Sequence, residues 1–336
     1  MSLLQPHLNQ LIQGRDLSAD EAHAAFSSVM DGACSEVEIA ALLTALRVKG
    51  EAVSEVVGAA RAMQERATPI KTRHTGLLDT CGTGGDELHT FNISTAAAFV
   101  VASAGVPVPK HGNRGVSSKS GSADVLEALG VNINLSPDQV TRCLDELKIG
   151  FCFAPLFHGA MKHAAPVRKQ LKFRTIFNLL GPLTNPARAE YQLVGAARQE
   201  TAAKLAQALS QLGRRRVLVV CGADELDEVS LWGKTTVYEV RESQILKHEW
   251  TAETFGLPAC TVADVRVDSA AESAAVIRGV FAGDKGAARN IVLANAAAGL
   301  IAAEKDIDPK SAVVRAAEAI DSGKTRELLD KLIAVR

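Results

Sequence analysis

Three short segments between residues 79 and 130 carry the glycine, hydroxyl and basic side chains that bind anions. They are residues 82–86 (GTGGD), 92–95 (NIST) and 110–114 (KHGNR), and serines follow the last of them. Glycines let backbone N–H groups converge on a ligand, a helix N-terminus adds unpaired donors, and lysine and arginine neutralise phosphate charge. Three such segments so close together predict a ligand with several phosphates, or with one phosphate and a second anion.

The GTGGD segment matches neither of the common nucleotide-binding fingerprints. It is not GxGxxG, and it lacks the GK[ST] ending of a P-loop. A tight turn between a strand and a helix is the alternative interpretation. Two adjacent glycines after Gly-Thr exceed what such a turn needs, so a nest of backbone N–H groups around an anion is favoured.

The other two segments also have ordinary alternatives. Asn92 can be a plain helix cap, although capping and phosphate binding are compatible because both use the same unpaired N–H groups. Ser94 could in addition offer its hydroxyl to a metal. The KHGNR segment can be a solvated basic loop, but glycine and asparagine between the charges suit phosphate oxygens. His111 has either a catalytic role or a hydrogen-bonded structural role.

An acidic loop follows the apolar strand predicted at residues 217–221. Its carboxylates are Asp224, Glu225, Asp227 and Glu228. A solvated acidic loop is the common alternative, but the carboxyl end of a strand is where sites concentrate. Adjacent carboxylates suit Mg²⁺ that also binds substrate phosphates. Asp227–Glu228 is the better pair, although spacing alone does not choose it over Asp224–Glu225.

The first part of the chain, to about residue 68, is expected to form four short helices. Capping-box patterns begin at Ser18 and Ser35, and Pro69 prevents continuation of a helix over about 53–66. Four short helices cannot bury a large core of their own. Their apolar faces are expected to pack on the rest of the chain or on a second subunit.

From Leu77 onward, short apolar runs alternate with helical patterns. Strands are expected at 77–81, 151–154, 191–196, 217–221 and 235–240, with an extended stretch at 106–109. Helices are expected at 94–104, 122–129, after Ser136, and at 199–212, 269–281, 285–304, 309–322 and 325–334. The alternation predicts an α/β fold with a mainly parallel central sheet flanked by helices.

Residues 156 to about 187 depart from this alternation and are expected to return to the helical part. Arg168 lies in this stretch, and a surface salt bridge is the default interpretation for a single arginine. A role in recognising a carboxylate would require the side chain to face the cleft.

Composition excludes several classes of protein. The 336 residues are 47% hydrophobic and 22% charged, as in ordinary globular proteins. A net charge of −1 argues against a general nucleic-acid binder. No apolar run is long enough to predict a membrane span, and the N-terminus lacks the features of a signal peptide. The six cysteines form no CxxC pair, so we expect them to be reduced in a cytoplasmic protein that has no membrane or nucleic-acid partner.

Taken in order, the motifs resemble one family closely. They are GTGGD, NIST and KHGNR, then GSADVLEALG (121–130), PVRKQLKFRTIFNLLGPLTNP (166–186) and LDE (226–228). Together they resemble the anthranilate phosphoribosyltransferases of the tryptophan pathway over roughly residues 4 to 330. Pyrimidine nucleoside phosphorylases belong to the same wider family.

The resemblance implies a small all-helical domain hinged to a larger α/β domain. The helical domain would comprise residues 1–70 with about 160–187 and would usually form a homodimer interface. The phosphoribosyl-binding domain would comprise residues 71–159 and 188–336. The implied reaction joins anthranilate to phosphoribosyl pyrophosphate with Mg²⁺, two ions being expected, and releases pyrophosphate.

The resemblance also implies site residues. Anthranilate would contact Gly82, Asn113 and Arg168, and the metal would be bound by Ser94, Asp227 and Glu228. The phosphoribosyl pyrophosphate site would comprise Gly82, Gly85, Asp86, Thr90, Asn92, Ile93, Ser94, Thr95, Lys110, His111, Gly112, Asn113, Arg114, Gly115, Val116, Ser117, Ser118 and Ser122.

The chain departs from the family pattern in two places. Glu87 follows GTGGD where a glycine is expected, and Ala223-Asp224-Glu225 replaces a more glycine-rich approach to LDE. Both changes add negative charge near a phosphate or metal site, so they bear on metal affinity and loop geometry. A nucleoside phosphorylase and a non-catalytic phosphate-ligand sensor are the alternatives. The Asn113 and Arg168 matches disfavour the first, and retention of every polar motif disfavours the second.

Overall fold

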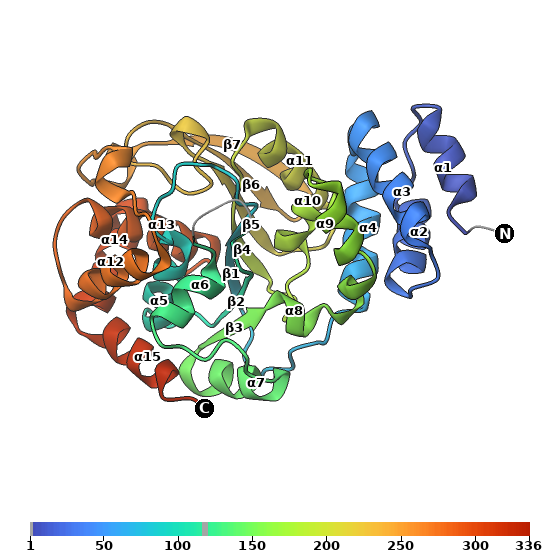
Figure 1. Cartoon of the computed structure of the whole chain (residues 1–336). Coiled ribbons are helices and arrows are strands. Elements are labelled where there is room, and N and C mark those ends of the chain that lie inside the picture. The colour runs from blue at the N-terminus through green and yellow to red at the C-terminus, as the bar shows by residue number, and fades with distance from the viewer. Residues whose placement is uncertain (1–2, 116–119) are drawn as a thin grey trace.

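The computed structural model describes residues 3–115 and 120–336. Its N-terminal part is helical, as expected, and consists of α1 (Gln5–Ile12), α2 (Ala19–Met30), α3 (Glu36–Lys49) and α4 (Val53–Glu65). Both predicted capping boxes are confirmed. The hydroxyls of Ser18 and Ser35 accept hydrogen bonds from the backbone N–H groups of Glu21 and Glu38, and the carboxylates of these glutamates accept from the serine N–H groups. These helices lie together at one end of the molecule (Figure 1).

Strands and helices alternate through the rest of the chain. The strands are β1 (Leu78–Gly82), β2 (Val108–Gly112), β3 (Ile149–Phe153), β4 (Tyr191–Gly195), β5 (Arg216–Cys221), β6 (Thr235–Arg241) and β7 (Gln244–Trp250). The helices are α5 (Ile93–Ser103), α6 (Ser122–Ala128), α7 (Pro137–Leu147), α8 (Ala154–Phe157), α9 (Ala165–Leu171), α10 (Phe177–Leu180), α11 (Gln199–Ser210), α12 (Ala270–Ala282), α13 (Ala287–Ala302), α14 (Pro309–Asp321) and α15 (Lys324–Ile333).

The main sheet has the strand order β1-β4-β5-β6-β7. Strands β1, β4 and β5 are parallel, while β6 and β7 form an antiparallel hairpin at one edge. A second, two-stranded sheet pairs β2 with β3 in parallel. The predicted α/β fold with parallel strands flanked by helices is therefore confirmed, and the hairpin makes the main sheet mixed.

Strand β7 was missing from the sequence-based prediction, which expected a mostly helical remainder. Its seven residues are exposed or half-buried, so it has no buried face. Without a buried face, a strand shows no alternation of apolar and polar residues.

The sheet separates two hydrophobic cores. Along β5, Leu218 and Val220 pack in the core formed with α5 and α13, whereas Val217 and Val219 pack in the other core. The second core is shared with α2, α3 and α4, and α11 lies between α4 and the sheet. The expectation that the N-terminal helices pack on the rest of the chain is therefore confirmed.

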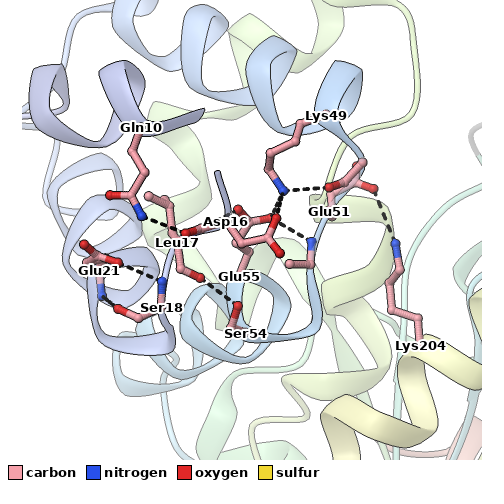
Figure 2. A network of polar contacts seen from close by, with 12 residues as sticks. Gln10, Asp16, Leu17, Ser18, Glu21, Lys49, Glu51, Ser54, Glu55 and Lys204 are labelled. Carbon is pink, nitrogen blue, oxygen red and sulfur yellow. Dashed lines mark hydrogen bonds and ion pairs between the residues drawn. The ribbon is translucent and has the colours of Figure 1, made fainter. Parts of the chain in front are cut away.

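A polar network joins the helical part internally and to α11 (Figure 2). The fully buried carboxylate of Glu55 accepts hydrogen bonds from the Leu17 N–H (3.0 Å) and from Lys49 Nζ (3.1 Å). Glu51 reaches Lys204 of α11 at 3.9 Å. A buried charge requires such partners. The network therefore fixes the start of α4 against the end of α3 and against α11.

Segment 156–187 contacts the N-terminal helices, with α9 against α3 and α10 against α4. Within residues 3–115 and 120–336, no helix is long and apolar enough to cross a membrane. All six cysteines are free thiols.

Candidate active site

The site forms where parallel strands end. Gly82 closes β1 and pairs with Gly195, which closes β4, and the loop after β5 brings Asp227 onto both glycines. A Cβ added at Gly82 would lie 2.6 Å from Asp227 Oδ2, and one added at Gly195 would overlap the Asp227 carbonyl oxygen. Only glycine allows this close approach. Gly195 was not among the predicted site residues, and its one signal is a glycine next to the last residue of the predicted strand 191–196.

The glycine loop binds the Asp227 carboxylate directly. The Gly84 N–H donates to Asp227 Oδ2 at 2.9 Å, and the Thr83 N–H donates to the Gly195 carbonyl. Burial, and then the charge of Asp86, raises the pKa of Asp227 to about 7. The predicted site residues Gly82, Asp86 and Asp227 therefore lie together.

Glu228 occupies the N-terminus of α5. Its Oε1 accepts a hydrogen bond from the Ser94 N–H at 2.9 Å. Burial, and then the charge of Asp227, raises the pKa of Glu228 to about 8. A carboxylate here uses the N–H donors and the helix dipole that would otherwise hold a phosphate.

Asn92 does not cap α5 with its side chain, contrary to the plain-cap interpretation. Its amide instead donates to the Ser120 carbonyl (3.1 Å), and its Oδ1 accepts from the hydroxyls of Ser120 and Ser273 (both 2.8 Å). Asn92 therefore ties the start of α5 to the segment before α6 and to α12.

Three neighbouring predicted site residues have structural contacts. Ile93 is buried in the core, and its N–H donates to the Phe91 carbonyl. Thr95 is fully buried, and Thr90 forms an isolated bridge with Arg266. A binding role for these three residues stays a prediction.

Lys110 is a buried ammonium between two sets of carboxylates. Its Nζ donates to the Thr80 carbonyl at 2.5 Å, which holds β2 beside β1. Burial lowers the pKa of Lys110, while the negative charges of Asp79, Glu228 and Asp227 oppose that shift. Lys110 therefore places a positive charge near the acidic pair.

His111 is buried next to Lys110 and faces His158, with 5.1 Å between the ring centroids. The backbone N–H of His111 donates to Asp79 Oδ1 at 3.1 Å, and the ring Nδ1 lies 3.2 Å from the Gly181 carbonyl oxygen. Burial lowers the pKa of His111 to about 4 and that of His158 to about 3. Both rings are therefore neutral at neutral pH.

The segment after β2 turns back onto α6. The Asn113 carbonyl accepts from the Ala123 N–H (3.2 Å) and from the Ser122 hydroxyl (3.3 Å). A Cβ at Gly112 would overlap the same hydroxyl. These contacts place Gly112, Asn113 and Ser122 at one corner of the site.

Arg114 forms ion pairs with Asp124 (3.0 Å) and Glu127 (2.5 Å), and the Gly115 N–H donates to Asp124. Its guanidinium is thus held by carboxylates, and phosphate binding by Arg114 stays a prediction. Val116, Ser117 and Ser118 lie outside the described residues.

Arg168 does not form the surface salt bridge that is the default for one arginine. Its guanidinium lies 5.1 Å from the centre of the Phe177 ring, and no ion pair to it occurs in residues 3–115 and 120–336. Burial lowers the pKa of Arg168. A half-buried arginine without a carboxylate partner is suited to bind an acidic ligand.

The two departures from the family pattern coincide with unusual backbone. Glu87 has a φ of 57°, and Asp224 and Glu225 have φ values of 55° and 62°. These values lie in the left-handed region that glycine favours. At these positions the backbone therefore has the conformation that glycine favours, although the residues are acidic.

The residues present suit Mg²⁺ bound together with a phosphate ligand. Ser94, Asp227 and Glu228 come together as predicted, and Asp86 lies next to Asp227. Among the residues that the structure describes, no group of three or more acidic, histidine or cysteine side chains forms a complete metal cage. Mg²⁺ commonly uses one or two carboxylates and takes its other ligands from water and substrate phosphates.

Comparison with known proteins places this geometry in a family. The glycosyl transferase family model for the helical bundle domain matches residues 5–67, and that for the a/b domain matches residues 74–326. The chain is 51% identical over 335 residues to the anthranilate phosphoribosyltransferase of Chromobacterium violaceum, covering 98% of this chain and 97% of that protein. The chain belongs to the anthranilate phosphoribosyltransferase family. The Moorella thermoacetica member is 48% identical over 332 residues, covering 99% of this chain and 98% of that protein.

Solved structures of the family have the same fold. The Thermus thermophilus anthranilate phosphoribosyltransferase superposes with a TM-score of 0.91 at 41% identity, covering 98% of both chains. The Saccharomyces cerevisiae enzyme, solved in complex with PRPP and Mg, superposes with a TM-score of 0.90 at 27% identity and covers 98% of this chain and 96% of its own. The fold and family expected from the motifs are thus confirmed, while the role of each site residue stays a prediction.

Proposed function

We propose that this chain joins anthranilate to phosphoribosyl pyrophosphate in tryptophan biosynthesis. The observation that carries the proposal is the convergence of Asp227 and Glu228 on the glycine loop and on the N-terminus of α5. That convergence brings N–H donors, carboxylates and Lys110 to one edge of the sheet. It supports a site for an anionic donor and a divalent cation together.

The reaction forms a bond from the anthranilate nitrogen to the anomeric carbon of the ribose. The bond from that carbon to pyrophosphate breaks, pyrophosphate leaves with the electron pair, and the nitrogen loses one proton. An aromatic amine is neutral at pH 7, so no strong base is needed, and no covalent nucleophile is required. Departure of pyrophosphate is the harder task.

The protein groups therefore act mainly on the donor. The glycine loop would orient its phosphates, and Lys110 supplies positive charge. Asp227, Glu228 and Ser94 would hold Mg²⁺, and we propose that two ions bind. A metal held there would supply positive charge to balance the charge that grows on pyrophosphate as it leaves.

Arg168 is proposed to bind the anthranilate carboxylate, together with Asn113 and Gly82. Replacing Arg168 by alanine is expected to raise the anthranilate KM by about 10- to 100-fold, because a hydrogen-bonded charge pair contributes about 1.5–3 kcal/mol. The KM of the phosphoribosyl donor should change little. Steady-state kinetics with each substrate varied in turn measures both, and an effect confined to the donor would contradict this role.

Two alternatives make different predictions in one pair of assays. The proposal predicts that anthranilate fluorescence decays in the presence of phosphoribosyl pyrophosphate and Mg²⁺. A nucleoside phosphorylase would instead cleave a pyrimidine nucleoside with inorganic phosphate, and a non-catalytic sensor would do neither.

The chain is proposed to form a homodimer through α3. The exposed residues Val37, Ala41, Thr44 and Val48 form one small or apolar stripe along this helix, and Val37 and Val48 are 78% and 82% exposed. Helix α3 belongs to the group of helices at one end of the molecule, between α4 and α1 (Figure 1). An uncovered apolar stripe of this kind suits a self-complementary interface.

Replacing Val37 and Val48 together by glutamate is expected to convert the dimer to monomer, because two charges would be buried without partners. Sedimentation equilibrium measures the mass. The matched control is Ile307→Glu, since Ile307 is 89% exposed and lies outside the helical part. A wild-type monomer, or a double variant that remains dimeric, would contradict this interface.

We also propose that residues 160–187 belong with residues 1–70 in the helical domain and that residues 71–159 and 188–336 form the phosphoribosyl-binding domain. The contacts of α9 with α3 and of α10 with α4 support this division. A cytoplasmic location is part of the same proposal.

A further inference from the structure

Arg174 lies directly against the glycine loop. A Cβ added at Gly85 would overlap Nη1 of Arg174, so the guanidinium occupies the side of Gly85 that every other residue type would fill. Within residues 3–115 and 120–336, no hydrogen bond or ion pair engages this guanidinium. A charged group is therefore placed at the candidate donor site without a protein partner.

The backbone holds Arg174 in this position from both sides. Helix α9 ends at Leu171, and Lys172 directly after it has a left-handed conformation with a φ of 56°. The Thr175 N–H donates to Asn178 Oδ1 at 2.9 Å, which fixes the turn into α10. Arg174 thus lies between two anchored helix ends rather than in a free loop.

Arg174 is exposed, and two other arginines lie near its guanidinium. Partial burial, and then the positive charges of Arg198 and Arg47, lowers the pKa of Arg174, and Asp227 is the acidic group that opposes this. Arg47 belongs to α3, and Arg198 immediately precedes α11. The carboxylate of Glu225 lies 4.0 Å from Nε of Arg198, so this ion pair is long. Positive charges from three elements therefore lie near one another, and an anion bound at Arg174 would reduce their repulsion.

We propose that Arg174 binds the pyrophosphate group of the phosphoribosyl donor beside the glycine loop. This inference rests on the proposed function and adds a residue that the motif analysis did not assign. A guanidinium presents paired N–H donors that match phosphate oxygens. Because the pyrophosphate gains charge as it leaves, Arg174 binds it more tightly in the transition state than in the bound donor.

The test compares Arg174→Gln and Arg174→Lys with a matched control, Lys169→Gln, which removes one exposed positive charge from the same segment. Arg174→Gln is expected to raise the donor KM and the inhibition constant of pyrophosphate by about 10- to 100-fold, since hydrogen bonds to charged groups contribute about 1.5–3 kcal/mol. Arg174→Lys should recover part of this loss. Lys169→Gln should stay within about twofold of wild type.

The anthranilate KM and the melting temperature separate binding from a merely structural role. Both should stay close to wild type in Arg174→Gln. Unchanged donor and pyrophosphate constants, or a change confined to the anthranilate KM, would overturn the inference. If the wild type did not consume anthranilate, the proposed function would fall. Calorimetric titration of pyrophosphate with Mg²⁺ into wild type and Arg174→Gln would then still decide whether Arg174 binds it.

Discussion

Replacing Asp227 by asparagine and Glu228 by glutamine is expected to lower Mg²⁺-dependent turnover by about a thousandfold or more. Each carboxylate is held by a backbone N–H, from Gly84 and Ser94, so the amides can occupy the same places. They cannot provide the negative charge that a divalent cation requires. Loss of one preorganised electrostatic group commonly costs about 10²–10³ in kcat, and two are removed here.

Thermal stability distinguishes this loss from unfolding. The pKa of both carboxyls is raised in the folded protein, so their ionised forms lower its stability as the pH rises above ordinary carboxyl values. Neutral amides avoid this cost, and the metal-free variant should melt at or above the wild-type temperature. The matched control is Asp224→Asn with Glu225→Gln, in exposed residues of the same loop. Equal kinetics in the two double variants would remove Asp227 and Glu228 from the mechanism.

Replacing Gly195 by alanine is expected to disrupt the site and destabilise the protein together. The added methyl group would overlap the Asp227 carbonyl oxygen, which is backbone and cannot rotate away. Overpacking typically costs about 1–3 kcal/mol, and this contact should lie at the upper end. The loop must shift, which moves Asp227 away from Gly84, so turnover should fall by at least about tenfold.

The control for this variant is Gly159→Ala. Gly159 has no atom within 4 Å of a built Cβ and no positive φ, so alanine should change neither turnover nor melting temperature. Differential scanning fluorimetry and steady-state kinetics measure both variants. A Gly195→Ala protein with wild-type stability and turnover would show that the Asp227 loop does not depend on this close approach.

Local sequence signals predicted the parts of the structure that depend on neighbouring residues. The capping boxes at Ser18 and Ser35 are formed as expected, because each joins residues three apart in the chain. The glycine loop and the acidic loop were both placed correctly at strand ends, since the carboxyl ends of parallel strands meet at one edge.

Long-range contacts decided what the sequence could not show. Glu228 bonds the N-terminus of α5 across 134 positions of the chain, so the side chain of Asn92 is not the cap. Gly195 and Arg174 acquire their roles only through contact with Asp227 and Gly85. A pattern along one segment carries no information about which distant segment will lie against it.

The site at the ends of β1, β4 and β5 is proposed to transfer the phosphoribosyl group to anthranilate. The direct measurement follows anthranilate fluorescence and pyrophosphate release together in the wild-type protein, with phosphoribosyl pyrophosphate present and Mg²⁺ added last. We expect both to begin on addition of Mg²⁺ and to proceed with one pyrophosphate released per anthranilate consumed. Absence of anthranilate consumption, or pyrophosphate release that does not depend on anthranilate, would contradict it.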